Sequence, residues 1–342
     1  MHLPPARGPL SSALIDVLLG RADVQWLVQS CSTAETSPAV DVSVDDDLQL
    51  TLYLMYELHY GALAGVPDSW EWQPDVLRAR AVLEGQFERA LRTAAQVPPR
   101  SRQPIARTLF AMARSDSGPS VASFVARHAT RAQVAEALVL RSPYQLKEGD
   151  PQTFAIPRLR GRAKAALVEI QSDEYGGGRA ERMHSALFAR SMRALGLDDE
   201  PNAYLDHVPA LVLASNNALS LFALHRRLSP ALCGHLAAFE MTSSIPAKRW
   251  VAGMQRLGLG ADAWGFFDEH IEADAVHEQI AAQDLCGALL DEDRTRRADI
   301  LLGAQTCLAL DRRVDELVLQ AWQQGRSALR RPLPESLQSE SA

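Results

Sequence analysis

The stretch FFDEHIEADAVHEQI, residues 266–280, carries the most informative pattern in the chain. On an α-helix, successive residues are about 100° apart, so Asp274 and His277 project within roughly 40° of His270, on opposite sides of it. All three side chains therefore share one face of a helix that we expect between about Asp262 and Leu290. A stripe of two imidazoles and one carboxylate on one face is the pattern around which the rest of the chain is interpreted.

The spacing of this stripe favours two metal ions over one. At about 1.5 Å of rise per residue, the Cα atoms of His270 and His277 lie about 10 Å apart along the axis, whereas two residues that chelate one ion usually sit one turn apart. Asp274 is within reach of either position. The alternative is a solvated polar face. Three apolar side chains on the adjoining flank favour a position beside the core, where such a stripe needs partners or a metal: Trp264, Phe267 and Ile271.

The remainder of the chain predicts an all-α protein. Ala, Leu, Arg and Glu recur at spacings of three and four, and alternating runs of β-branched residues are almost absent. The chain has 342 residues, 47% of them hydrophobic, which is enough to bury a full core. Turn-rich stretches at 98–104 and 115–120 place a boundary near residue 116. We expect an N-terminal helical region at 1–115, the main domain at 116–328 and a disordered tail at 329–342.

Charge and cysteine usage narrow the class of protein. The formal net charge is -7, and Lys and Arg are scattered, so neither nucleic acid nor a membrane is an expected partner. No long apolar run or leader pattern is visible, which predicts a cytoplasmic protein that acts on a small molecule or another protein. Four widely separated cysteines without a C-x-x-C motif are expected to be packing thiols: Cys31, Cys233, Cys286 and Cys307.

Other helices are expected to supply inward-facing ligands. Glu174 lies on the apolar face of a predicted helix at 161–174, and Glu240 ends an apolar stripe on the helix that begins at Ser229-Pro230. His184 shares a face with apolar residues of the helix that follows Arg179. The three glycines at 176–178 would bend the chain so that Glu174 and His184 can meet, although a flexible loop is the alternative.

Two further carboxylates compete for a place in the site. Glu181 forms E-x-x-H with His184, the spacing of ferritin-like di-iron bundles, and could replace Glu174. Glu148 ends a short helix predicted to open at Ser142-Pro143 and could add a ligand, although a surface position is the default. A set of imidazoles and carboxylates without thiolates suits iron or manganese.

Two residues of the N-terminal region look like ligands but are assigned structural roles. Glu57 and His59 are two residues apart, so on a helix they point roughly 200° apart and cannot share a metal.

At these residues the chain resembles the haem-oxygenase-like di-iron oxidases, helical proteins often labelled iron-containing redox enzymes. The resemblance spans about residues 140–290, through SPYQLKEGDP, EIQSDEYGGG and above all H-x-x-x-D-x-x-H at 270–277, with Glu240 thirty residues before it. It implies a haem-oxygenase-like helical bundle with an additional N-terminal helical region that mediates dimer formation. It also implies Glu148 as an extra ligand beside six others: Glu174, His184, Glu240, His270, Asp274 and His277.

The resemblance further implies two iron ions as cofactors, O2 as co-substrate, and an external reductant. The reaction would be oxidation of a small organic substrate by N-oxygenation, decarboxylation or C–C cleavage, with no catalytic residue beyond the metal ligands. Two alternatives remain, namely a haem-binding oxygenase and a metal-free helical scaffold or interaction protein with the same fold.

Overall fold

The computed structural model describes residues 3–34, 41–61, 63–95 and 103–334, and all regular structure in these ranges is helical. The predicted all-α class is therefore confirmed. None of the described helices combines the length and the apolar composition needed to cross a membrane. The four cysteines are unpaired and buried, in agreement with their predicted role as packing thiols.

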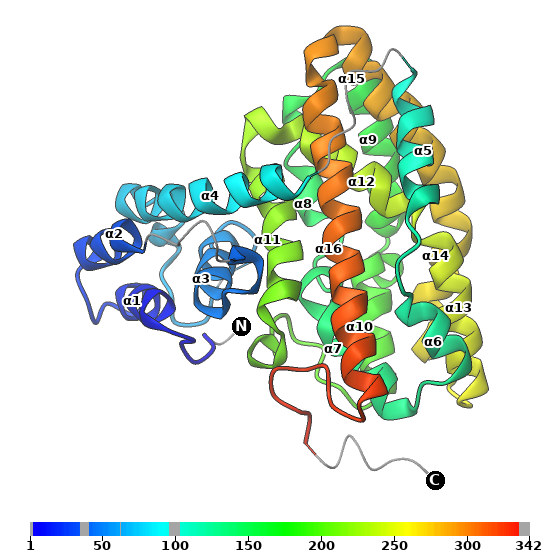
Figure 1. The fold of residues 1–342 in the computed structure, drawn as a ribbon, viewed down its shortest axis with the longest axis horizontal. Coiled ribbons are helices and arrows are strands. Elements are labelled where there is room, and N and C mark those ends of the chain that lie inside the picture. Colours follow the sequence, from blue (N-terminus) through cyan, green and yellow to red (C-terminus); the bar gives the residue numbers. More distant parts are fainter. Residues whose placement is uncertain (1–2, 35–40, 62, 96–102, 335–342) are drawn as a thin grey trace.

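Four N-terminal helices lie together at one side of the molecule (Figure 1). α3 packs against α11 of the bundle, and α4 runs across the direction of the long helices α11 and α16. Gln73 caps α4 through its side chain, Pro74 opens the helix, and apolar residues at spacings of three and four, Val76 to Leu91, are buried. The bounds of the four are α1 (Pro9–Leu18), α2 (Val24–Thr33), α3 (Asp46–Glu57) and α4 (Pro74–Ala94).

The remaining helices form the bundle that holds the candidate site (Figure 1). α11 and α12 are buried almost all round, and α16 packs along α12. Their bounds are α5 (Ile105–Ser115), α6 (Val121–Arg127), α7 (Arg131–Gln145), α8 (Asp150–Thr153), α9 (Gly161–Glu174), α10 (His184–Ala194), α11 (Ala210–Leu224), α12 (Ser229–Met241), α13 (Ser244–Arg256), α14 (Ala261–Gln279), α15 (Cys286–Glu292) and α16 (Arg297–Gln323).

A buried ion pair joins the N-terminal helices to the bundle. The carboxylate of Glu57, at the end of α3, pairs with the ammonium of Lys147 and accepts a hydrogen bond from Asn202 Nδ2 at 3.0 Å. The same ammonium lies over the rings of Tyr53 and Tyr60. Because Lys147 precedes Glu148 in the chain, this contact fixes the turn that carries a candidate ligand.

The predicted helix start at Ser142-Pro143 is wrong. Pro143 lies in the last turn of α7, which begins eleven residues before Ser142 with a capping box between Thr130 and Gln133. A proline near the end of a helix ends it within a turn, and a Ser-Pro pair alone does not separate this case from a helix start. Glu148 accordingly lies in the turn between α7 and α8.

The long helix predicted from Asp262 to Leu290 is continuous but not uniform. α14 is followed by a π-helical segment, η8 (Ile280–Leu285), and then by α15. Gly260 is the residue at the N-cap position of α14, so Asp262 is not its cap. π-helical turns within α-helices are frequent beside functional sites.

The boundary predicted near residue 116 is not marked by a gap in packing. α5, within the predicted N-terminal region, packs against α12, α15 and α16 of the bundle. Of the tail predicted at 329–342, residues 335–342 lie outside the described residues, and Leu329 and Leu333 are buried.

Candidate metal centre

α14 turns its polar stripe toward the interior of the bundle. The side chains of His270, Asp274 and His277 are 6%, 2% and 1% exposed, and the helix packs against α10, α12 and α13. Burial of two imidazoles and a carboxylate on one face excludes the solvated-surface interpretation of this stripe. These side chains must find partners among groups from the neighbouring helices.

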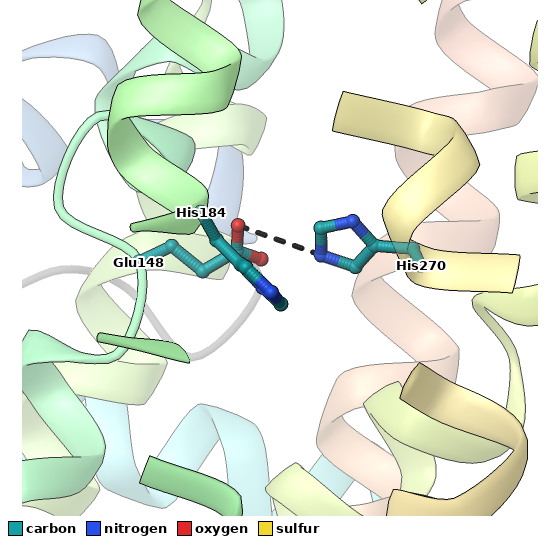
Figure 2. A group of neighbouring side chains, drawn as sticks. All are labelled: Glu148, His184 and His270. Atoms are coloured by element: carbon teal, nitrogen blue, oxygen red, sulfur yellow. Dashed lines mark ion pairs between the residues drawn. The ribbon is translucent and has the colours of Figure 1, made fainter. Parts of the chain in front are cut away.

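The first group of partners consists of Glu148, His184 and His270 (Figure 2). One ligand atom from each lies within 4.8 Å of the other two. His270 Nε2 lies 3.7 Å from Glu148 Oε2, and Nδ1 of the same ring lies 2.7 Å from the carbonyl oxygen of Phe266. A neutral His270 that donates through Nδ1 directs its free Nε2 lone pair into the group.

The second group consists of Glu174, Glu240 and His277, whose ligand atoms also lie within 4.8 Å of one another. His277 Nδ1 lies 3.5 Å from Glu240 Oε2. The other ring nitrogen, Nε2, lies 3.0 Å from Asp173 Oδ2, a distance at which it donates a hydrogen bond to that carboxylate. A carboxylate on the outer nitrogen of a histidine fixes its tautomer and leaves the inner nitrogen free to bind a metal.

Glu174 brings the two groups into contact. Its Oε2 lies 3.0 Å from His184 Nδ1 of the first group. The approach depends on the three glycines after α9, all of which adopt positive φ, at 64°, 59° and 80°. Residues with a Cβ adopt such angles rarely, so this tight reversal needs glycine. The predicted bend between Glu174 and His184 is therefore present.

A small cavity of about 10 Å³ lies where the groups meet, roughly the space of one water molecule or ion. Glu148 and His270 of the first group line it together with Glu174 and Glu240 of the second, and Asp274 is also among the lining residues. Asp274 therefore faces the same small space as residues of both groups, although it belongs to neither of them.

Burial and mutual charge shift the pKa values of these residues. Burial alone lowers the pKa of His270, but the surrounding carboxylates, Glu148 foremost, outweigh it and raise the pKa to about 10. At His277, burial likewise lowers the pKa, but the hydrogen bond and charge of Glu240 outweigh it and raise the pKa to about 9. Burial and the charge of Glu240 raise the pKa of Asp274 to about 9. Without a metal, the centre therefore retains protons that offset its enclosed negative charge.

The residues present fit a metal. Buried polar atoms are nearly always hydrogen-bonded, yet six at this place make no well-aligned hydrogen bond within the described part of the chain. Carboxylates and imidazoles without thiolates form a ligand set suited to iron or manganese. The six atoms are Glu148 Oε2, Glu174 Oε2, His184 Nδ1, His270 Nε2, Asp274 Oδ2 and His277 Nδ1.

The two competing carboxylates are placed differently from each other. Glu181 is exposed in the 3-10 turn η5 (Ala180–Arg182) and belongs to neither group. The E-x-x-H spacing brings two side chains together only on a continuous helix, and α10 begins at His184 itself. Glu148, for which a surface position was the default, is 3% exposed and lies in the first group.

The two structural assignments in the N-terminal region agree with the observed contacts. Glu57 pairs with Lys147, and His59 lies beside Arg80 and Glu71. Neither residue belongs to either group of candidate ligands.

A cavity of about 500 Å³ adjoins the first group. Glu148 and His270 lie in its wall, so the cavity gives access to that group from one side. The lining is mixed, with apolar side chains, aromatic side chains that include Phe266 and Phe267, and charged side chains. Besides Glu148, the charged residues of the lining are Asp116, Arg141, Arg249, Asp311, Arg312 and Asp315.

Residues 135–312 match the family model described as iron-containing redox enzyme. The matched segment is more than half of the chain and includes every candidate ligand from Glu148 to His277. The chain belongs to the iron-containing redox enzyme family. The resemblance inferred from the motif at 270–277 is thereby confirmed.

This iron-containing redox enzyme is also similar to the nitrosourea synthase of Streptomyces achromogenes subsp. streptozoticus. The two are 26% identical over 155 residues, which are 45% of this chain and 33% of the synthase. The similarity thus spans about a third of the length of that curated relative. Membership of a family of iron-containing redox enzymes supports an oxidoreductase function.

Sequence reasoning missed one residue that contacts a candidate ligand. Asp173 was available as the neighbour of Glu174, but its contact with His277 joins helices a hundred residues apart.

Proposed function

We propose that this chain is a non-haem di-iron oxidase that uses O2 and an external reductant to oxidise a small organic substrate. One observation carries the proposal: two buried groups, each of three candidate ligands, meet at Glu174 and His184, and Asp274 lines a small cavity together with residues of both groups. Glu148, His184 and His270 would hold one ion. Glu174, Glu240 and His277 would hold the other, with Asp274 in reach of either.

The two irons, when bound, would supply the redox chemistry with O2. The protein would position the two ions and form the wall of the substrate cavity. Glu174 would help to hold both ions, because it belongs to the second group and its Oε2 lies 3.0 Å from Nδ1 of His184 in the first. Phe266, whose carbonyl orients His270, and Phe267 line the large cavity, so the substrate would meet an apolar wall beside the first ion.

Among the three reaction types, we favour N-oxygenation. A relative of this chain is named for making a nitrosourea, a compound that contains an oxidised nitrogen. The cavity wall also carries charged side chains, which disfavours a long alkyl chain as substrate. Decarboxylation and C–C cleavage remain outcomes of a substrate screen.

Metal analysis of the anaerobically Fe(II)-loaded protein by mass spectrometry tests the proposal. About two irons per chain are expected, since two ligand groups are present. His270→Ala and Asp274→Ala should each reduce this number, whereas His128→Ala, at an exposed histidine, should not. Unchanged iron binding in the first two variants would show that the ligand assignment is wrong.

The same preparation separates the alternatives. A metal-free scaffold would bind no iron and keep its melting temperature on addition of Fe(II), because a ligand stabilises only the state that binds it. A haem-binding oxygenase would shift the Soret band of added haemin. No shift is expected, since four carboxylates surround the candidate axial histidines.

We also propose that residues 1–115 mediate a homodimer. Two tryptophans of this region, Trp26 and Trp72, are 46% and 67% exposed, and large exposed aromatic side chains are enriched at protein interfaces. Sedimentation velocity should show a dimer that the double variant Trp26→Ser/Trp72→Ser converts to a monomer. A monomeric parent protein at all concentrations would contradict this assignment.

A further inference from the structure

Two buried polar side chains, His235 and Gln145, lie in the wall of the large cavity. His235 of α12 is 6% exposed, and Gln145, the last residue of α7, is 4% exposed. Within the described ranges, neither the imidazole nor the carboxamide makes a hydrogen bond, and Nδ1 of the ring and Oε1 of the amide are fully buried. Buried polar groups are nearly always paired, so both side chains require a partner that enters the cavity.

Both side chains lie beside the place where the large cavity meets the candidate metal centre. Four residues line both the large cavity and the small cavity of about 10 Å³: Tyr144, Glu148, Phe239 and His270. Phe239 is one helical turn beyond His235 on α12, about 6 Å along the axis, and Tyr144 directly precedes Gln145. The rings of Tyr144 and Phe239 contact each other edge to face, with 5.5 Å between their centroids. This contact brings α7 and α12 together close to the first ligand group.

Other histidines outside the metal centre have the partners that a structural role requires. His225 Nε2 lies 2.9 Å from Glu84 Oε2, and His207 Nδ1 lies 2.7 Å from the carbonyl oxygen of Arg331. The ring of His235 instead meets the ring of Phe222 edge to face, with 6.4 Å between centroids. His235 is therefore not explained by a contact that stabilises the fold.

The two side chains are uncharged at neutral pH. Burial lowers the pKa of His235 to about 4, and no charge in the described part of the chain adds to this shift or opposes it. A neutral imidazole offers one N–H donor and one lone pair. The carboxamide of Gln145 likewise offers N–H donors and an acceptor oxygen. This part of the wall thus presents hydrogen-bonding groups of both kinds without a charge.

We propose that His235 and Gln145 bind an uncharged carboxamide group of the substrate. A carboxamide donates through its N–H and accepts through its C=O, so it matches two neutral side chains that each donate and accept. A charged group is less favourable here, because neither residue supplies an opposite charge to offset its desolvation.

The two residues determine specificity by holding the amide close to the junction of the two cavities. The rest of the substrate then extends toward Glu148 and His270, so the position of the amide sets which atom reaches the first metal position. This inference rests on the proposed function for the reaction that follows. The hydrogen-bonding complementarity belongs to the cavity and does not depend on bound iron.

Three probes of similar shape test the subsite: phenylacetamide, phenylacetone and phenylacetate. Phenylacetone keeps the carbonyl but has no N–H, and phenylacetate adds a negative charge. In titration calorimetry with the full-length protein, phenylacetamide is expected to bind at least about fivefold more tightly than either, because only the amide pairs both kinds of group. Equal affinities for amide and ketone, tighter binding of phenylacetate, or no binding of the amide would overturn the proposal.

Variants then locate the site. His235→Phe and Gln145→Leu remove the polar atoms with little change in size, and each should reduce the ratio of amide to ketone affinity toward one. His128→Phe is the control, since His128 is exposed and lies outside the cavity. The ratio compares two ligands on the same protein, so a general loss of folded protein does not change it. A ratio unchanged in both cavity variants would place the amide elsewhere and overturn the assignment.

Thermal unfolding of His235→Phe without a probe separates a binding role from a structural one. The change removes a buried polar group that has no partner among the described residues, so the melting temperature should stay the same or increase. A lower melting temperature with an unchanged affinity ratio would identify a structural residue and refute the binding role.

Titrations of metal-free and of anaerobically Fe(II)-loaded protein distinguish this proposal from the di-iron oxidase. Selective amide binding by a chain that takes up no iron would refute the oxidase and support the subsite. Iron uptake without selective amide binding would refute the subsite and leave the oxidase standing.

Discussion

Two glycines hold α12 against α16, and replacing one of them tests how the centre is supported. A Cβ added to Gly234 would lie 2.7 Å from the carbonyl carbon of Ile300, with the carbonyl oxygen nearer still. At the same helix crossing, a Cβ on Gly303 of α16 would lie 2.6 Å from the carbonyl carbon of Ala231 of α12. Both contacts are with backbone, which cannot turn aside as a flexible side chain can.

The magnitude of the perturbation follows from these distances. Ordinary Cβ contacts begin at 3.4 Å and the nearest atom is the carbonyl oxygen of Ile300, so Gly234→Ala requires the helices to move apart by about 1.5 Å. Overpacking of this kind typically costs 1–3 kcal/mol, and an unyielding backbone puts Gly234→Ala near the upper value, about 3 kcal/mol. In a chain of this size, about 3 kcal/mol corresponds to a decrease in melting temperature of about 4 °C.

The same displacement should reach the metal centre. Glu240 lies on α12 less than two turns beyond Gly234, so a shift of the helix moves a ligand of the second group. We expect Gly234→Ala to weaken binding of the second iron more than binding of the first, whose ligands come from other elements. Competition with a chelator during anaerobic Fe(II) titration distinguishes the two.

The control is Gly265→Ala in α14, where an added Cβ meets nothing within 4 Å. This change should stabilise the protein by about 0.5–1 kcal/mol through helix propensity. The double variant Gly234→Ala/Gly303→Ala should cost less than the sum of the single changes, since one separation of the helices relieves both contacts. A Gly234→Ala protein as stable as the parent would refute the reasoning.

Three further predictions concern single contacts. Asp173→Ala removes the acceptor for His277 Nε2 and should weaken iron binding about tenfold in a chelator competition, whereas Glu169→Ala, exposed on the same helix, should not. Lys147→Met leaves Glu57 buried without its cation and should cost about 3 kcal/mol in urea unfolding, part of which Glu57→Gln restores. Iron must displace protons from His270 and His277, because their metal-free pKa values are raised to about 10 and about 9. Fe(II) affinity should therefore increase as pH rises from 6 to 9, and calorimetry in buffers of different ionisation enthalpy should show proton release. Binding that does not depend on pH would contradict this prediction.

Helical periodicity predicted the faces that carry most candidate ligands. α9 has the expected bounds, and Glu174 is buried on its apolar face. Glu240 and the stripe on α14 are buried in the same way. Such predictions work because a polar residue that shares the apolar face of an amphipathic helix is buried together with that face. Which ligands would share an ion depends on how five separate elements pack together. This tertiary arrangement cannot be read from any local sequence pattern.

Errors in the prediction arose where one short pattern has two structural meanings. Ser142-Pro143 fits the start of a helix but lies at the end of α7. Glu181 has the E-x-x-H spacing to His184 but lies in a turn, because the glycines at 176–178 end one helix and the next begins only at His184. Glu148 has no periodic context at all, since it sits in a turn that Lys147 and Glu57 hold in place from another region of the chain.

The cavity escaped prediction for a different reason. A residue in the wall of a cavity keeps accessible surface, so it is not required to be apolar, and its neighbours on the same helix face need not be apolar either. Asp311 and Asp315 therefore look, in the sequence, like a solvated pair four residues apart. Periodicity detects ligands of a buried metal because the metal site is part of the core, whereas a substrate site is a space that the core leaves open. For this chain, the candidate ligands were consequently within reach of sequence reasoning, whereas the cavity beside them depends on the arrangement of α7 and α16 around one space.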